Sequence, residues 1–192
     1  SKYVDILSAN LYGGIEPPID TIKTMWKYSG KPFIVSEFFS KANDAVDMNG
    51  YSLGNQSNAG LIVDTQADRA VMYENYTLLL LESQTCLGWT WYRFRDNDQT
   101  IYQDANGVKY RVFDYRNDAI SEYYNLDTDT RVSLANMPKV EIFYKGEGDT
   151  SNLGSNKGIY DNKMNLYEEL AASMKKISTN LFGIIKYFDS IH

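Results

Sequence analysis

A short apolar segment that ends on a carboxylate constrains the fold of this chain more than any other feature. In Phe33–Val35 three strand-forming residues follow one another without polar alternation, which is typical of a strand covered on both faces in a parallel sheet. Pro32 lacks a backbone N–H and fits the start of that strand, so Glu37 falls at its carboxyl end. Chemistry in α/β folds is done at this end, which makes Glu37 a candidate catalytic residue. The alternatives are a polar residue that meets solvent and one half of a structural ion pair.

Segments of strand and helix character alternate along the chain, which indicates right-handed βαβ units and a parallel sheet. Thr65 and Asp68 have the spacing of a capping box at the start of a long helix. Three strands are too few for a closed barrel, which has eight βα units. The expected strands are Tyr3–Ala9, Phe33–Glu37 and Cys86–Trp91, and the expected helices are Ile19–Tyr28 (ending at Gly30), Gln66–Gln84 and about Lys163–Asp189.

Two long segments separate these elements. Phe38–Asp64 exceeds the usual length of a βα connection and is expected to be a functional lid or binding loop. The chain from about 92 to 160 is expected to be an irregular insertion with one hairpin around Asp104–Gly107. With these loops included, residues 1–192 fit a single domain.

Composition and charge limit the classes of partner. The 19 Lys and Arg against 25 Asp and Glu give a net charge of −6 with scattered basic residues, which argues against nucleic acid and anionic membranes. The longest apolar run, Leu78–Leu81, is far shorter than the ~20 residues of a membrane span. The first residues show no signal-peptide pattern. The single cysteine, Cys86, excludes an intrachain disulfide and fits a buried strand position.

Aromatic residues make up 14% of the chain. This density suits either a core rich in tyrosine or a cleft that stacks on flat apolar faces such as those of sugars.

Three segments together resemble the carboxyl-terminal part of β-agarase-like glycoside hydrolases, which have a retaining (β/α)8 barrel. These segments are Lys31–Phe39, Thr65–Asp98 and Ser155–Asp161. The resemblance spans most of the chain and implies an α/β fold that is part of a TIM barrel. The three parallel strands would correspond to barrel strands six, seven and eight, and the poorly matched region of about 100–154 to an enlarged last βα loop.

The resemblance also implies a function. It suggests a secreted enzyme, extracellular or periplasmic, that hydrolyses agarose or a related β-linked galactan with retention of configuration. Glu37 takes the place of the nucleophile at the end of strand seven. A retaining mechanism needs a second carboxyl group ~5 Å away. The family supplies this acid/base from strand four, before this chain begins, and Glu74-Asn75 has the reversed order inside a helix.

Several residues near Glu37 are candidates for binding substrate. Tyr12 would donate a hydrogen bond that keeps a nucleophilic carboxylate ionised and aimed, although a core tyrosine is the alternative. Asn10 would bond sugar hydroxyls or be a turn residue. Trp91, and as second choice Trp89, would support a galactose ring. Their spacing of two places both indoles on one side of the strand, so at least one of them can instead pack against a helix. The remaining candidates for contact with substrate are Arg93 and Asp96.

Asp96-Asn97-Asp98 lacks the glycine and the distal glutamate of an EF-hand loop. Contacts with sugar hydroxyls or a network that orders the loop are therefore favoured over a metal, and no metal or cofactor is expected.

A half-barrel leaves an open strand edge and an uncovered apolar face. The chain is therefore expected to associate with itself or with the missing amino-terminal half of the barrel, besides its polysaccharide substrate. The rival to the hydrolase is a carbohydrate-binding or assembly module that holds a glycan or a partner without cleaving it.

Overall fold

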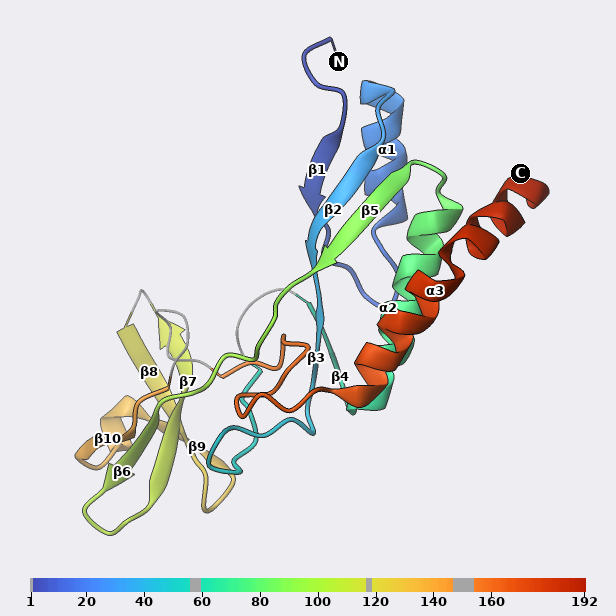
Figure 1. Ribbon diagram of the computed structural model, residues 1–192. Helices are drawn as coiled ribbons and strands as arrows, with labels where there is room; N and C mark the ends of the chain where they lie inside the picture. The colour runs from blue at the N-terminus through green and yellow to red at the C-terminus, as the bar shows by residue number, and fades with distance from the viewer. Residues whose placement is uncertain (1, 56–59, 117–118, 147–153) are drawn as a thin grey trace.

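The computed structural model describes residues 2–55, 60–116, 119–146 and 154–192. Within these ranges the chain forms a parallel sheet covered by helices and, beyond the carboxyl ends of its strands, a second sheet that is antiparallel (Figure 1). None of the helices in the described ranges is long and apolar enough to cross a membrane.

The parallel sheet has the strand order β1-β2-β5. β1 begins later than the expected Tyr3 because its pairing with β2 starts at Leu7, opposite Phe33. All neighbouring strands run parallel, which confirms the expected alternation of strands and helices. The three strands are β1 (Leu7–Asn10), β2 (Phe33–Phe38) and β5 (Cys86–Trp91).

Three helices pack on one face of this sheet: α1 (Ile19–Ser29), α2 (Gln66–Glu82) and α3 (Glu168–Ile191) (Figure 1). Burying an aliphatic or aromatic side chain contributes roughly 1.5–3 kcal/mol, so this interface holds the sheet to the helices. The largest hydrophobic core lies there and includes Ile22, Phe33, Val35, Tyr76, Leu80 and Leu170.

The opposite face of the parallel sheet is open. Side chains alternate along β2, so that Val35 is buried whereas Ile34 is 38% exposed and Ser36 is exposed. Leu87 on β5 is 61% exposed. The expectation that the strand at Phe33–Glu37 is covered on both faces is therefore wrong, because within this chain helices cover one face only.

The helix ends follow the local sequence. α1 ends at Gly30, as predicted, and Gly30 adopts the left-handed conformation (φ 61°) there. The capping box at Thr65 is also confirmed: Thr65 Oγ1 accepts from Asp68 N, and Asp68 Oδ2 accepts from Thr65 N. α3 begins at Glu168 instead of Lys163, because Asp161 Oδ1 accepts from Lys163 N and Asn165 N and holds a turn there.

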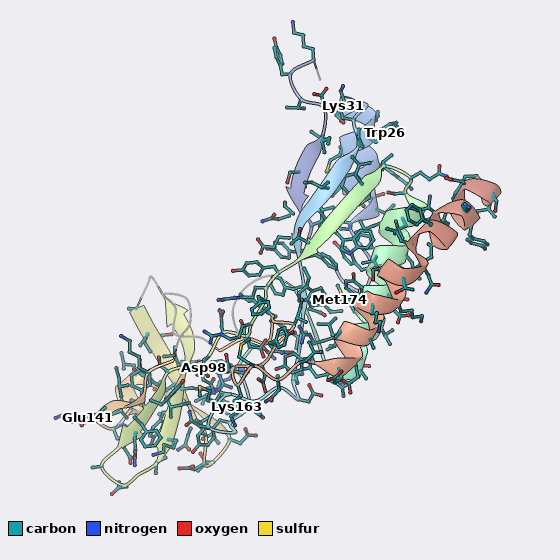
Figure 2. The ribbon with its side chains drawn as sticks, in the orientation of Figure 1. Trp26, Lys31, Asp98, Glu141, Lys163 and Met174 are labelled. Carbon is teal, nitrogen blue, oxygen red and sulfur yellow. The ribbon has the colours of Figure 1, made fainter. Side chains whose placement is uncertain are left out.

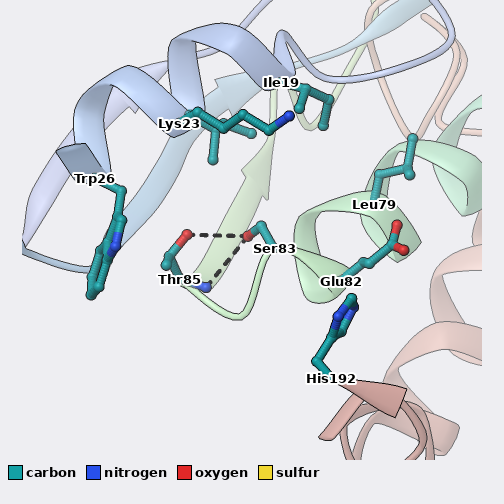
Figure 3. A pocket seen from close by; sticks show the side chains of 9 residues that line it. Ile19, Lys23, Trp26, Leu79, Glu82, Ser83, Thr85 and His192 are labelled. Carbon is teal, nitrogen blue, oxygen red and sulfur yellow. Dashed lines mark hydrogen bonds between the residues drawn. The ribbon is translucent and has the colours of Figure 1, made fainter.

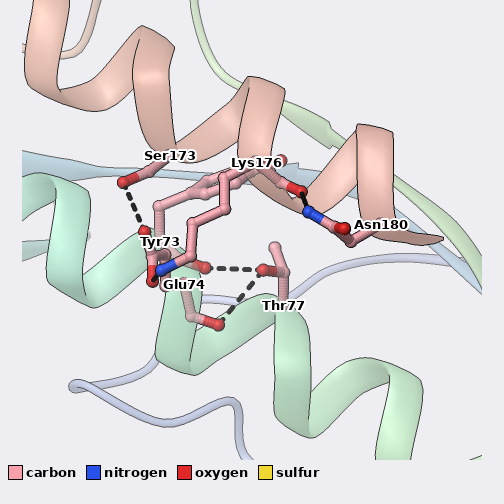
Figure 4. Close-up of polar contacts among 6 residues, drawn as sticks. All are labelled: Tyr73, Glu74, Thr77, Ser173, Lys176 and Asn180. Atoms are coloured by element: carbon pink, nitrogen blue, oxygen red, sulfur yellow. Dashed lines mark hydrogen bonds and ion pairs between the residues drawn. The ribbon is translucent and has the colours of Figure 1, made fainter. Parts of the chain in front are cut away.

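A polar contact joins α2 to α3 (Figure 4). Glu74 Oε1 accepts from Ser173 Oγ at 2.8 Å, and Glu74 Oε2 lies 2.6 Å from Lys176 Nζ. The hydrogen bond from Lys176 is the main cause that lowers the pKa of Glu74; burial opposes it, and the hydrogen bond from Ser173 and the charge of Lys176 add to the lowering. A carboxyl whose pKa is lower in the folded state stabilises the fold above its unfolded pKa and loses this contribution as the pH falls.

We therefore expect the free energy of unfolding to decrease as the pH falls through the folded pKa of Glu74, by less than about 1 kcal/mol from this pair, since Lys176 is well exposed. Urea unfolding at neutral and acidic pH measures it. Glu74→Gln and Lys176→Met should both flatten this dependence. An unchanged dependence in both variants would show that the pair contributes nothing.

The segment 38–64 contains a short pair of parallel strands, β3 (Ser40–Ala42) and β4 (Leu61–Val63). The prediction of a long loop without strands was therefore wrong in detail. Its residues 56–59 lie outside the described residues. β3 continues directly from β2 and carries the chain past the end of the parallel sheet (Figure 1).

The insertion is an ordered five-stranded antiparallel sheet of order β10-β6-β7-β8-β9. The predicted hairpin is confirmed, because β6 and β7 pair and Gly107 takes φ 87° in their turn. The prediction of an otherwise irregular insertion was wrong. Tyr110, Val112 and Tyr123 form a small core of its own. The strands are β6 (Ile101–Asp104), β7 (Lys109–Arg116), β8 (Ala119–Asn125), β9 (Thr130–Ser133) and β10 (Val140–Tyr144), with the 3-10 turn η1 (Leu134–Asn136) before the last.

The two chain segments that lead into and out of the antiparallel sheet lie side by side. Asn97 N donates to Ser155 O and Ser155 N to Asn97 O, both at 3.0 Å. A second bridge joins Arg95 to Tyr160. We call this paired segment, with Arg95–Asn97 on one side and Ser155–Tyr160 on the other, the stalk.

Candidate active site

The carboxyl ends of the three parallel strands meet at one edge of the sheet, on the side of the insertion (Figure 1). Glu37 stands near the end of β2 and Asn10 at the end of β1. A shift in register after Ala9 places Asn10 opposite Glu37. The structure therefore brings together the candidates Asn10, Tyr12 and Glu37.

Two side chains from the end of β1 hold the Glu37 carboxylate. The Tyr12 hydroxyl donates to Oε1, and Asn10 Nδ2 donates to Oε2 at 3.1 Å. Each carboxylate oxygen thus receives one hydrogen bond from a different neighbour. A carboxylate held in this way has a fixed orientation, which a nucleophile needs.

Tyr12 is suited to act as a permanent donor. Burial, and then the hydrogen bond and the charge of Glu37, raise the pKa of Tyr12 well above its usual range. Its hydroxyl is therefore protonated at neutral pH. The ring also contacts Phe39 edge-to-face at 5.4 Å between centroids, which fixes its position.

Ser36 completes this arrangement, although the sequence analysis did not single it out. Ser36 Oγ donates to Asn10 Oδ1 at 2.8 Å. The sequence contained a signal for this residue. Side chains alternate along a strand, so Ser36, which follows the buried Val35, has its side chain on the open face.

Both candidate tryptophans contact the helix side of the sheet. Trp89 Nε1 donates to the Tyr73 hydroxyl on α2 at 3.0 Å. The Trp91 indole lies against Phe38 and Tyr73, and its Nε1 donates to Lys157 O at 2.8 Å. Both indoles therefore pack toward the helices, which was the alternative to stacking on a sugar. Support of a sugar ring by either indole remains a prediction.

Asp96 is fully buried in the stalk, at a different place from Glu37, Tyr12 and Asn10. Its carboxylate accepts hydrogen bonds from Asn156 Nδ2 at 2.9 Å, from Gly158 N at 2.7 Å and from the Tyr167 hydroxyl at 2.5 Å. Burial raises the pKa of Asp96, and these donors with the charge of Arg69 oppose the shift. The geometry thus favours a network that orders the loop over contact with sugar hydroxyls.

Arg69 of α2 belongs to the same network and is also fully buried. Its Nε donates to Ser40 O at 3.1 Å, Nη1 to Gln66 Oε1 at 2.7 Å and Nη2 to Gly158 O at 2.8 Å. The guanidinium therefore ties α2 to β3 and to the stalk. The sequence analysis did not identify Arg69, although a charged residue at the start of a largely buried helix face was a signal.

Gly158 lies where the two sides of the stalk come close together. A Cβ at this position would lie 2.4 Å from Asp96 N, so a larger residue would force the two sides of the stalk apart. Arg93, the last candidate for contact with substrate, donates to Asn97 Oδ1 within the same loop. Its role toward substrate remains a prediction.

A cavity of about 520 Å³ lies elsewhere, between α1 and α2 (Figure 3). Thr85, which precedes β5, and Trp26 of α1 are among its lining residues, so it opens at the amino ends of the strands. Figure 2 shows Trp26 at the end of the molecule away from the insertion. The cavity is therefore separate from Glu37.

Metal binding was not expected. Within the described ranges, no group of three or more His, Cys, Asp and Glu side chains is arranged to hold a metal ion. Cys86, expected to be buried, is only half-buried; its Sγ donates to Gly88 O at 3.4 Å, and burial raises its thiol pKa.

No family model matches the sequence, and no curated protein matches it either. Solved structures do resemble the fold. BpGH50 is 25% identical with a TM-score of 0.60, over 98% of this chain and 28% of that protein. An exo-β-agarase is 17% identical with a TM-score of 0.57, over 96% of this chain and 17% of that protein. The agarase AgWH50C is 14% identical with a TM-score of 0.54, over 96% of this chain and 20% of that protein.

This chain therefore has a mixed helix–strand fold similar to part of known agarases, and it spans 17–28% of the length of the structures compared. The solved structures described as agarases thus have the same kind of fold as the family that the sequence resembles.

Proposed function

We propose that this chain is the carboxyl-terminal part of a retaining glycoside hydrolase with a (β/α)8 barrel, and that Glu37 is its nucleophile. The observation that carries the proposal is the Glu37 carboxylate at the carboxyl end of a parallel strand, with Asn10 and Tyr12 each donating to one of its oxygens. On this proposal β1, β2 and β5 are barrel strands six, seven and eight. The open face of the sheet is the side that lines the barrel interior.

In the first step one oxygen of Glu37 attacks the anomeric carbon, and the bond to the leaving oxygen breaks. An acid supplied from outside this chain protonates that oxygen. Water, deprotonated by the same outer residue, then cleaves the glycosyl ester and restores the Glu37 carboxylate with net retention of configuration. Tyr12 and Asn10 hold the carboxylate in its attacking orientation throughout.

The proposed substrate is agarose or another β-linked galactan, and the proposed site of action is outside the cell or in the periplasm. This part of the proposal rests on the sequence resemblance and on the similarity to agarases. Asn10 is placed to contact a sugar hydroxyl, since it is exposed on the open face. We retain Trp89, Trp91, Arg93 and Asp96 as secondary candidates that shape the site through the loops they hold.

Reducing-end release by the full-length protein tests the proposal, with agarose and a panel of β-linked galactans as substrates. We expect release from at least one galactan, and ¹H NMR of the first product should show the β-anomer. Release of the α-anomer first would exclude a retaining mechanism. Binding of galactans without any release would favour the rival, a non-catalytic module.

Exposed apolar residues support a further part of the proposal, that another half of the barrel covers the open face. Ile6, Ile34 and Leu87 are 49%, 38% and 61% exposed on or beside this sheet. We expect the isolated chain to self-associate, with light scattering as the measurement, because this apolar surface has no cover within the chain. Ile34→Lys with Leu87→Lys should reduce the association. A compact monomer that binds no hydrophobic dye would contradict it.

A further inference from the structure

Ser36 occupies a distinct place beside the proposed nucleophile. It precedes Glu37 on β2, and its side chain lies on the open face of the sheet with Asn10 of the neighbouring strand. Ser36 Oγ is 2.8 Å from Asn10 Oδ1, and Asn10 Nδ2 is 3.1 Å from Glu37 Oε2. The three side chains therefore form a continuous line from hydroxyl to amide to carboxylate.

The chemistry of these groups allows one direction for the hydrogen bonds. An ionised carboxylate only accepts, so the NH2 group of Asn10 must face Glu37. The Asn10 carbonyl oxygen then faces Ser36, and only the hydroxyl of Ser36 can donate to it. Hydrogen bonds arranged in series also polarise one another, so the Ser36 hydroxyl strengthens the bond that reaches Glu37.

We propose that Ser36 is a positioning residue that anchors the Asn10 amide, so that its NH2 group stays within hydrogen-bonding distance of Glu37. This inference rests on the proposed function of Glu37. Without Ser36, the Asn10 oxygen has lost its donor, and the side chain is free to rotate so that its NH2 group moves away from the carboxylate.

The role matters to the reaction because the displacement needs both carboxylate oxygens in place. Tyr12 holds Oε1 and Asn10 holds Oε2. When the Asn10 amide moves away, Oε2 loses its donor and the carboxylate is free to rotate away from its attacking position. The cost falls on the chemical step, whereas binding of the rest of the substrate is unchanged.

Kinetics of the full-length protein on the galactan it cleaves test this role. For Ser36→Ala we expect kcat to fall about tenfold, equivalent to about 1.4 kcal/mol, with KM unchanged within about twofold. Ser36→Thr keeps the hydroxyl and should restore kcat.

Ser8→Ala is the matched control. Ser8 is an exposed serine on the same face, two residues before Asn10 on β1. Its loss should leave kcat unchanged. An equal fall in Ser8→Ala and Ser36→Ala would overturn the proposal, because the effect would then belong to the surface and not to the line of hydrogen bonds.

Crystal structures of the full-length variants give a second measurement that does not depend on activity. The Asn10–Glu37 hydrogen bond should be lost or lengthened in Ser36→Ala and kept in Ser36→Thr. If Ser36→Ala keeps full kcat and an intact Asn10–Glu37 bond, and Glu37→Gln is inactive, the positioning role is overturned and the proposed function stands. Activity that survives Glu37→Gln would instead refute the proposed function, and the positioning role with it.

Discussion

Glu37→Gln in the full-length protein is expected to lower kcat on its galactan by at least about 10³-fold, which corresponds to about 4 kcal/mol of transition-state stabilisation. The amide has nearly the shape of the carboxylate and keeps one oxygen that can accept from Tyr12 or from Asn10, so the fold should be largely unaffected. It cannot form the glycosyl ester, because it carries no charge and is a poor nucleophile. Initial rates and an unchanged melting temperature together measure the effect.

A small external anion distinguishes a missing nucleophile from a damaged site. In Glu37→Gly, azide can enter the space of the lost side chain and attack the anomeric carbon from the same side. The product is then the α-glycosyl azide, while the leaving oxygen takes its proton from the acid outside this chain. Glu16→Gln, an exposed glutamate in the β1–α1 loop, is the matched control and should keep full activity. Activity in Glu37→Gln near that of the control would remove Glu37 as the nucleophile.

Arg69→Met is expected to cause the largest loss of stability, about 3–5 kcal/mol. Methionine fills much of the same space but donates no hydrogen bond. It leaves the carbonyl oxygens of Ser40 and Gly158 without their donor and removes the positive charge that faces the buried Asp96. For a unit of this size the melting temperature should fall on the order of 10 °C.

Arg131→Met is the control for this substitution. Arg131 is exposed on β9 and stacks on the Phe113 ring at 3.8 Å, so its loss should cost less than about 1 kcal/mol. Arg69→Lys should fall between the two variants, because lysine keeps the charge but cannot donate in three fixed directions. A melting temperature of Arg69→Met within 2 °C or so of the control would show that the network adds little to stability.

The parts of the fold that follow from short-range patterns were predictable from the sequence. Gly30 and the capping box at Thr65 each depend on residues within four positions, and both have the expected geometry. The position of Glu37 at the carboxyl end of its strand followed from Pro32 and the apolar run. These features need no knowledge of how distant segments pair.

The antiparallel sheet was missed because its order depends on pairing between strands. β7 does carry the two-residue alternation of a half-buried strand: Tyr110 and Val112 enter the small core, whereas Lys109 and Arg111 point to the other face. That signal was outweighed by the polar residues around it. Whether such a segment pairs depends on strands that are distant in the sequence and adjacent to it only in the fold.

The contacts of Trp89, Trp91 and Asp96 show a different limit. Alternation predicts that two residues share a face of a strand, but it does not say which face the helices cover. Similarly, the burial of Asp96 depends on Asn156, Gly158 and Tyr167, which are some 60 to 70 positions away in sequence. Long-range partners of this kind give Asp96 a place in the framework of the stalk that its neighbours in sequence do not predict.

The stalk has a consequence for how such a protein can change over time. Because Asn97 and Ser155 are bonded backbone to backbone, the points where the antiparallel sheet leaves and rejoins the chain are adjacent in space. An insertion held at two adjacent points can be gained, lost or exchanged for another without altering the register of the parallel strands. The reach of the protein beyond the carboxyl ends of its parallel strands can thus be varied by grafting, independently of the groups around Glu37.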